Sequence, residues 1–356
     1  MKYDITFHTS WWHKNAGVDF TQDFFDDPEY RMECDLKMKK ALYEHFGDFG
    51  LGEKDPVKRP LLGTDFLAAG YLYSEIMGCD IRYEPDNSPQ VISRNLDEDE
   101  IADIKAPNLD DNPVWKRTQK QIDYLLDKYG RVETYINLMG IQNIAMDLMG
   151  QNVLMAYYTA PDEIRRLLQE ITNLSIDIGR RFYSLSNDIS GGVTAIVRQV
   201  RPGNYLTSNC SVEMVSNEIY EEFLLEYDQQ LAAAFPDFGI HHCGKSMEHV
   251  VEGYSKVKNM TFAEVGAFSD IRRVREVLPD VFLNARYSPV RLATASEDEV
   301  MTEVRDLIIG GDNPAGAISI SCVGLDSNIS DEQIRYFLNA CRETAKEYPD
   351  IHRLCL

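Results

Sequence analysis

The fold is decided by three short apolar stretches: MTFAEV at 260–265, VFLNAR at 281–286 and AISISC at 317–322. Each is short and rich in β-branched or aromatic residues, so each predicts a buried strand. Longer segments of helical period separate them, such as the one that opens with a capping-box pair at Ser296 and Glu299. Strands and helices therefore alternate, which predicts parallel strands joined by helical crossovers.

The same rhythm extends toward the N-terminus from about residue 58. Further strand candidates lie at 60–63, 132–138, 193–197 and 238–243, and a shorter one lies at 205–208. The stretches 193–197 and 205–208 lie too close together for an intervening helix, so one of them is not a barrel strand, and a missing strand is expected near the N-terminus.

Such alternation is compatible with an open doubly wound sheet or with a closed barrel. The strand count favours an eight-stranded parallel β/α barrel of the TIM type. We expect a single domain over residues 1–356, in which an aromatic, mostly helical cap at 1–57 precedes the barrel at 58–356.

The composition excludes several classes of function. The formal net charge is −22, from 36 basic and 58 acidic residues, which argues against binding to nucleic acid or to an anionic membrane surface. No stretch approaches the roughly 20 apolar residues of a membrane span, and the N-terminus has no run of signal-peptide type. The seven cysteines are widely and irregularly spaced, as expected for free thiols or metal ligands in a cytoplasmic protein.

The sequence around His241 is the first candidate site. Ile240-His241-His242-Cys243-Gly244 ends a strand candidate. Residues two apart on a strand share a face, so His241 and Cys243 point together and His242 points away. An imidazole beside a thiolate suits zinc, and Gly244 lets the chain turn just after these residues.

A third ligand is expected from another strand end. Cys322 closes the last strand candidate, and the carboxyl ends of barrel strands meet at one rim. We therefore predict a zinc site formed by His241, Cys243 and Cys322, with a fourth position open as in catalytic sites. Cys210, which follows the 205–208 stretch, is a rival ligand.

Four polar residues near strand ends are candidates for contact with substrate. Glu264 closes an apolar strand, and its carboxylate either supports His241 from behind, contacts substrate or forms a salt bridge at the rim. Arg286 and Tyr287 are candidates to hold substrate at the rim, and the alternative is that Arg286 simply pairs with Glu264. Asn209 precedes Cys210 and is the fourth candidate.

The chain resembles the uroporphyrinogen decarboxylase superfamily after about residue 58. The segments that carry this resemblance are NLMG at 137–140, AMDLMG at 145–150, VSNEIYEEF at 215–223 and LNARYSP at 283–289. The resemblance implies an eight-stranded β/α barrel. The His-x-Cys-Gly motif with a late cysteine resembles the zinc- and corrinoid-dependent methyltransferase branch, whose ligand positions match His241, Cys243 and Cys322.

The N-terminal part carries a narrower resemblance. HTSWW at 8–12, DPEYR at 27–31 and GLGEKDP at 50–56 are similar to the first methyltransferase of anaerobic O-demethylase systems. This likeness implies that a methoxylated aromatic (a phenyl methyl ether) donates its methyl group to the cobalt(I) of a corrinoid (cobalamin) carried on a separate protein. Arg286 departs from the small polar residue that other branches often carry, so the substrate stays open.

Three alternatives remain. The enzyme could run as a methylcobalamin:thiol methyltransferase, because zinc also activates thiols. It could instead be a tetrapyrrole decarboxylase, although the arginine-rich start of those enzymes is missing at 8–15. The third alternative is a non-catalytic barrel that binds a corrinoid protein or a tetrapyrrole. Barrels of this size often form homodimers, and no residue decides that point.

Overall fold

The computed structural model describes residues 2–186 and 203–349. Its main sheet has six parallel strands in the order β1-β10-β9-β8-β7-β6, and two smaller sheets pair β2 with β5 and β3 with β4. The strands are β1 (Tyr3–Phe7), β2 (Leu61–Gly63), β3 (Asp80–Glu84), β4 (Asn87–Ile92), β5 (Glu133–Tyr135), β6 (Tyr205–Ser208), β7 (Phe238–His241), β8 (Met260–Val265), β9 (Phe282–Tyr287) and β10 (Ile318–Leu325).

Helices connect most of these strands. They are α1 (Thr9–Ala16), α2 (Gln22–Asp26), α3 (Pro28–Phe46), η1 (Gly47–Phe49), α4 (Leu72–Ile76), α5 (Glu98–Ile101), α6 (Pro113–Tyr129), α7 (Ile141–Met149), α8 (Asn152–Thr159), α9 (Pro161–Ser186), η2 (Cys210–Met214), α11 (Asn217–Ile219), η3 (Tyr220–Leu224), α12 (Leu225–Ala234), α13 (Val251–Tyr254), α14 (Ile271–Val277), α15 (Pro289–Leu292), α16 (Glu297–Gly311) and α17 (Asp331–Glu347). Within the described ranges, none of them combines the length and the apolar character needed to cross a bilayer.

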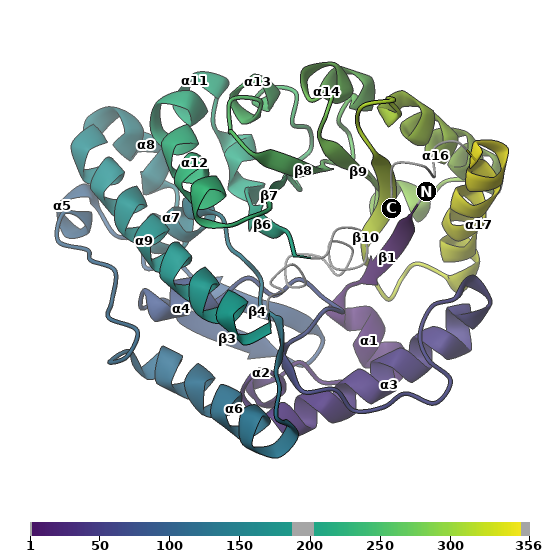
Figure 1. Cartoon of the computed structure of the whole chain (residues 1–356), viewed down its shortest axis with the longest axis horizontal. Helices are drawn as coiled ribbons and strands as arrows, with labels where there is room; N and C mark the ends of the chain where they lie inside the picture. Colours follow the sequence, from purple (N-terminus) through teal and green to yellow (C-terminus); the bar gives the residue numbers. More distant parts are fainter. Residues whose placement is uncertain (1, 187–202, 350–356) are drawn as a thin grey trace.

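The parallel strands curve around a common centre, and helices form the outer layer (Figure 1). Consecutive strands from β6 to β10 are neighbours in the sheet, each pair joined by a helical connection. This is the α/β architecture that the sequence predicts. The predicted capping box at Ser296 is confirmed, because the serine accepts a hydrogen bond from the backbone N–H of Glu299. Ser330 opens α17 with the same motif.

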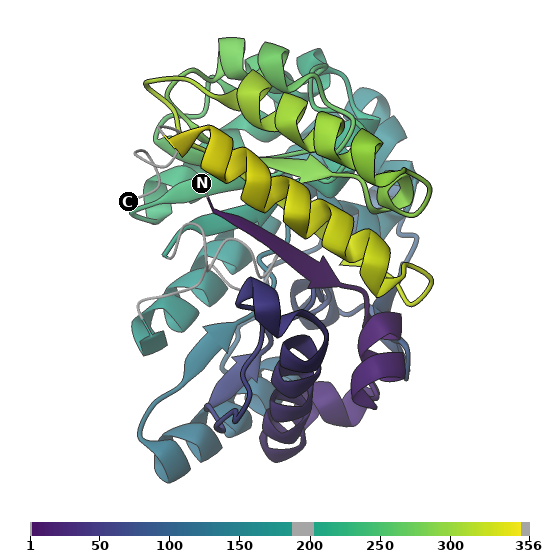
Figure 2. The ribbon, with the colours of Figure 1, turned by 90° about the vertical axis from the view of Figure 1, so that its right-hand side faces the viewer.

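The first strand lies beside the last one, so the N-terminal segment is not purely a cap. β1 pairs in parallel with β10, with Ile5 opposite Cys322, and Figure 2 shows β1 beneath α17 from the other end of the chain. This strand near the N-terminus fits the one that the strand count lacked. The predicted boundary at residue 57 therefore separates a strand from the sheet to which it belongs.

A closed ring of eight hydrogen-bonded strands is not what the described residues form. β2 and β5 make a separate parallel pair, linked to the main sheet through an isolated bridge between Met139 and Ser208, and no ladder joins β1 to β2 in those ranges. β3 and β4 form an antiparallel hairpin. The strand candidate at 193–197 lies outside the described residues.

β9 and β10 each present a polar face and a helix-packed face. On β9 and β10, Asn284 donates to Ser319 Oγ at 2.8 Å and accepts from Ser321 Oγ at 2.7 Å. Tyr287, on the opposite face of β9, stacks on Phe337 of α17 with ring centroids 5.7 Å apart. The polar face is therefore turned away from the helices, toward the centre that the strands enclose.

One carboxyl group in β1 is buried without a full set of partners. Asp4 Oδ1 accepts a hydrogen bond from the Ile5 N–H at 2.8 Å, and Asp4 Oδ2 has no hydrogen-bond partner. Burial raises the pKa of Asp4 to about 7, and the charge of Asp65 adds to the rise. Ionisation of Asp4 therefore opposes folding.

This burial predicts a pH-dependent gain in stability for Asp4→Asn. Because the folded-state pKa lies above the unfolded value, stability falls as pH rises between the two and the penalty is complete above the folded pKa. A shift of this size corresponds to about 4 kcal/mol. We expect Asp4→Asn to raise the free energy of unfolding by roughly 2–4 kcal/mol at pH 8 and by little at pH 4. Urea denaturation at both pH values measures this.

Asp80→Asn is the matched control, because Asp80 is an exposed strand aspartate on β3. It should change stability little at either pH. A gain for Asp4→Asn of equal size at pH 4 and pH 8 would contradict the assignment, since it would not come from the ionised carboxylate.

Candidate metal centre

The two histidines at the end of β7 have different environments. His241 is the last residue of β7, and its register partner on β8 is Glu264. The side chain of His242 faces the other way, where Nδ1 lies 2.9 Å from Tyr254 Oη and Nε2 lies 3.1 Å from the Ser246 carbonyl. Burial lowers the pKa of His242 to about 4. His242 is thus a neutral, hydrogen-bonded core residue, as the strand alternation predicts.

Cys210 joins His241 and Cys243 in one cluster. One ligand atom from each of the three lies within 4.8 Å of the others. Cys210 begins η2 directly after β6, and Ser208 of β6 is the register partner of His241. Two adjacent parallel strands therefore deliver all three side chains at their carboxyl ends, where α/β folds place their sites.

The ring of His241 is oriented by a carboxylate. Glu264 Oε2 lies 2.6 Å from His241 Nδ1, and both side chains are buried. Burial acts to lower the pKa of His241, but the charges of Glu264 and Cys210 outweigh it and raise the pKa to about 9. An Nδ1–H donated to Glu264 leaves Nε2 as the nitrogen for a metal, the usual arrangement of a histidine ligand.

A hydrogen bond couples the two thiols of the cluster. A hydrogen bond from Cys243 lowers the pKa of Cys210 well below its usual value, against the effect of burial and with help from the charge of His241. The hydrogen bond to Cys210, together with burial, raises the pKa of Cys243. A divalent cation held by both sulfurs would favour the thiolate form of each. The donor set of two sulfurs and one imidazole therefore fits zinc.

A close approach explains Gly244. Its backbone φ is not in the left-handed region, so a special turn conformation is not the reason for glycine here. A Cβ at this position would lie 2.7 Å from Glu213 Oε2, while Glu213 Oε1 accepts the Lys245 N–H at 2.7 Å. Glycine thus lets the loop that carries Cys243 pack against η2, which carries Cys210.

The structure does not bring Cys322 into this cluster. Cys322 is fully buried on β10, and its thiol is close enough to Cys341 of α17 for the two to interact electrostatically. This is the helix-packed face of the strand. The expected third ligand from β10 is replaced by Cys210, the rival from the end of β6.

Two of the other predicted site residues also face the helices. Tyr287 donates its hydroxyl to Glu303 of α16 at 2.7 Å, in addition to its stacking on α17. Asn209 Nδ2 donates to Asp228 of α12 at 2.7 Å. The prediction that Tyr287 and Asn209 contact substrate does not fit these positions.

A cavity of about 320 Å³ opens beside the cluster. Arg286 lines it and also lies 3.5 Å from Glu264, measured from Nε to Oε1. The residues that line this cavity are Ala68, Gly70, Asn137, Met139, Asn143, Ser208, Cys210, His241, Cys243, Arg286 and Val323. We refer to it as the cluster cavity.

Sequence reasoning missed the wall of this cavity that follows β2 and β5. Asn137, Met139 and Asn143 belong to the segment after β5 and the start of α7. The predicted strand 132–138 extended through Asn137, whereas β5 ends at Tyr135. A polar residue such as Asn137 just beyond an apolar strand was the available signal.

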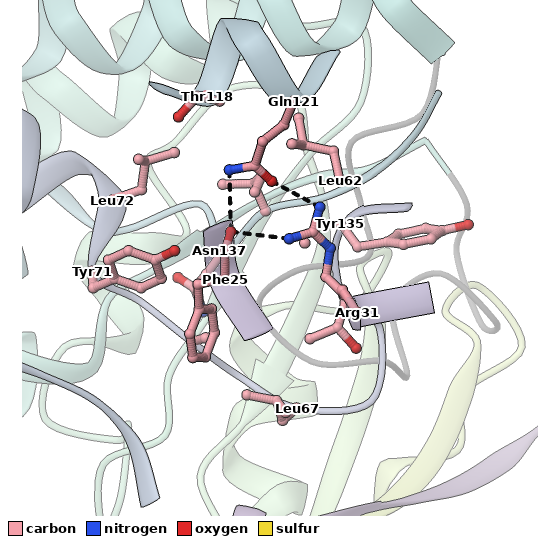
Figure 3. Close-up of a pocket in the computed structure, with 14 residues that line it drawn as sticks. Phe25, Arg31, Leu62, Leu67, Tyr71, Leu72, Thr118, Gln121, Tyr135 and Asn137 are labelled. Carbon is pink, nitrogen blue, oxygen red and sulfur yellow. Dashed lines mark hydrogen bonds between the residues drawn. The ribbon is translucent and has the colours of Figure 1, made fainter. Parts of the chain in front are cut away.

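A second cavity, near Arg31, is structural (Figure 3). It holds about 30 Å³, enough for one or two water molecules. The Arg31 guanidinium donates to the carbonyls of Phe24, Phe25 and Leu61 and to Gln121 Oε1 at 2.9–3.2 Å. These bonds occupy the guanidinium, so Arg31 fixes α3 to β2 and offers nothing to a ligand.

The fold and the site together define an α/β protein of the parallel, barrel-like class with a cysteine–histidine cluster at the carboxyl ends of its strands. The family model for uroporphyrinogen decarboxylase matches residues 71–344, so the chain belongs to that family. A methyltransferase from Methanosarcina mazei has a similar structure, with a TM-score of 0.66 and 15% sequence identity over 95% of this chain and 93% of that chain. No curated protein sequence matches the chain.

Proposed function

We propose that the chain is a zinc-dependent methyltransferase that takes a methyl group from a methoxylated aromatic and passes it to the cobalt(I) of a corrinoid protein. The observation that carries the proposal is the Cys210–His241–Cys243 cluster beside an open cavity. Three protein ligands leave a fourth position free, the pattern of catalytic zinc sites. The structural similarity to a methyltransferase and the family membership agree with this reading.

The chemistry explains why such a site needs a metal. The phenolate of an aryl methyl ether is a poor leaving group, and zinc supplies a Lewis acid that stabilises the negative charge on its oxygen. Glu264 holds the Nδ1–H of His241 and so fixes the ring and its tautomer. The walls of the cluster cavity orient the ring of the substrate.

A tetrapyrrole decarboxylase is less well supported. The cluster cavity has about 320 Å³, the lower end of the range for small-molecule sites and too little for a macrocycle with its side chains. Among its described lining residues, Arg286 is the single arginine or lysine, whereas a substrate with several carboxylates calls for several cations. The cavity size fits a compound with one aromatic ring.

Methyl transfer tests the proposal directly. The zinc-loaded protein is mixed with a methoxylated aromatic and free cob(I)alamin, and methylcobalamin formation is followed by absorbance. We expect methylcobalamin to form with the aromatic donor and the demethylated phenol to appear in equal amount. Formation of a thioether from methylcobalamin and a thiol, with no reaction of the aromatic ether, would support the methylcobalamin:thiol alternative. No transfer in either direction would refute the proposal.

Glu264→Gln should weaken the binding of zinc. The substitution keeps a hydrogen-bond acceptor for His241 but removes the negative charge that makes the imidazole a stronger ligand. We expect the dissociation constant for zinc to rise roughly 10- to 100-fold, as measured by competition with a chromophoric chelator. Glu303→Gln is the control, because it alters a carboxylate that accepts a hydrogen bond from Tyr287 in the helix layer. This variant should leave the dissociation constant for zinc unchanged. Equal affinities in wild type and Glu264→Gln would rule out this role for Glu264.

A further inference from the structure

Arg286 is a largely buried cation, and two of its nitrogens make no hydrogen bond. Its side chain is 12% exposed. Nε and Nη1 have no hydrogen-bond partner. Leaving a buried charged donor without a partner costs more than the hydrogen bond itself would contribute. Such a group is retained most readily where a ligand completes it.

Glu264 does not satisfy this guanidinium. The distance from Arg286 Nε to Glu264 Oε1 is 3.5 Å, longer than a charge-assisted hydrogen bond. The other oxygen of Glu264 is committed to His241 at 2.6 Å. The carboxylate thus lowers the electrostatic cost of burying Arg286 but leaves its donors free.

Arg286 belongs to the wall of the cluster cavity. Arg286 lines that cavity together with Cys210, His241 and Cys243, so a small molecule held at the cluster lies within reach of the guanidinium. The remaining described lining consists of neutral side chains and glycine. The chain as a whole carries a net charge of −22, so an anionic ligand needs a local cation of this kind to enter.

Asn137 is a further residue of the same wall with a polar atom that makes no hydrogen bond. Its Oδ1 is buried without a hydrogen-bond partner and lies beside Gly70, whose Cβ, if present, would be 3.1 Å away. Because the oxygen and nitrogen of the amide exchange by a flip, Asn137 offers the ligand an acceptor or a donor. The cavity thus places neutral polar side chains, among them Asn137, beside the cation Arg286.

The geometry points to Arg286 as the residue that selects an anionic methyl donor, in which a carboxylate on the methoxylated ring pairs with the guanidinium. This inference rests on the proposed function and specifies its substrate class. Arginine suits the task because its planar fork matches a carboxylate. The pairing fixes the ring at one end while the ether oxygen faces the cluster. Binding of the carboxylate would thus hold the methyl ether in the orientation that transfer requires.

Equilibrium binding tests the inference without methyl transfer. Zinc-loaded protein in a buffer without carboxylates is titrated in a calorimeter with 3-methoxybenzoate and with its neutral analogue 3-methoxybenzamide. The wild type should bind the benzoate roughly 10- to 100-fold more tightly than the amide, the size expected for a charged hydrogen bond. Arg286→Gln should remove that preference while its affinity for the amide and its zinc content stay unchanged.

Arg291→Gln is the matched control. Arg291 lies just beyond β9 but pairs with Glu299 and Glu303 outside the cluster cavity, so this variant should keep the wild-type preference. The inference is overturned if the wild type does not prefer the benzoate, if it binds neither compound, if Arg286→Gln keeps the preference, or if that variant loses zinc.

The two proposals fail in different ways. Tight binding of the benzoate through Arg286 without transfer to cob(I)alamin would refute the methyltransferase and leave the anion site in place. Equal methyl transfer from neutral and anionic donors, in the wild type and in Arg286→Gln, would support the methyltransferase and refute the selection of an anionic donor by Arg286.

Discussion

Cys210→Ser should lose bound zinc and methyl transfer, whereas Cys322→Ala should keep both. Cys210 contributes a sulfur to the cluster, and a serine hydroxyl is a poor ligand because it is not deprotonated near neutral pH. With two ligands left, we expect zinc to fall from about one per chain to near zero. Methyl transfer should fall by a factor on the order of 100 or more, the scale of losing several kcal/mol of charge stabilisation.

Metal analysis by mass spectrometry and the cob(I)alamin assay measure the two effects. Cys322→Ala is the matched variant, because it also removes a thiol close to a strand end but from the helix-packed face of β10. It should cost roughly 1–2 kcal/mol of stability through lost packing without loss of metal. Retention of zinc in Cys210→Ser together with its loss in Cys322→Ala would restore the ligand set first expected from the sequence.

The choice between Cys210 and Cys322 as a member of the cluster depends on which face of its strand each side chain takes. The rule that sites lie at the carboxyl ends of strands pointed to both cysteines, but it does not state which face each side chain takes. The alternation of apolar and polar residues in AISISC at 317–322 does indicate the face. Cys322 is in phase with the apolar Ile318 and Ile320, whereas Ser319 and Ser321 occupy the polar face.

The same parity argument applies to β9. Asn284 and Arg286 are in phase on the polar face, and Tyr287 belongs with the apolar residues that contact the helices. Arg286 could therefore have been favoured over Tyr287 from the sequence alone. The short apolar runs predict where the strands lie. The face that each side chain takes follows from a weaker pattern, the alternation of polar and apolar residues along the strand.

Other features could not be reached from local patterns. The pairing of β1 with β10 joins the two ends of the chain, and nothing local in a five-residue strand specifies its distant partner. The walls of the cluster cavity after β2 and β5 depend on how loops fold over the strand ends, for instance around Asn137. Tertiary packing, rather than propensity, decides such positions.

Arg59→Met should be the most destabilising change outside the metal centre. Arg59 precedes β2, and its guanidinium bonds Asp35 of α3 at 2.6 and 3.1 Å and Asp65 at 2.5 and 2.9 Å. It also lies 5.3 Å from the centre of the Tyr135 ring. One buried cation therefore ties α3, β2 and β5 together where no ladder joins β1 to β2 in the described ranges.

Methionine fills the space but leaves two buried carboxylates without their shared cation. Removing one partner of a buried ion pair costs about 3–5 kcal/mol, so we expect the free energy of unfolding at pH 8 to fall by that amount. Burial already raises the pKa of Asp35 against the opposing effect of Arg59, and loss of Arg59 raises it further. Because a higher pKa lets Asp35 take up a proton in the folded state at a higher pH, part of its charge is lost by pH 5 and the destabilisation should be smaller there.

Urea denaturation at pH 5 and pH 8 measures both effects. Arg131→Met is the matched control, because Arg131 is a 66% exposed arginine that pairs with Glu133 at 3.4 Å, and exposed pairs contribute at most about 1 kcal/mol. Adding Asp35→Asn to Arg59→Met should recover part of the loss at pH 8, since it removes the charge of one of the two carboxylates that Arg59 bonds. If Arg59→Met lowered stability equally at both pH values, or if Asp35→Asn added to the loss, the guanidinium would act through packing rather than through its charge.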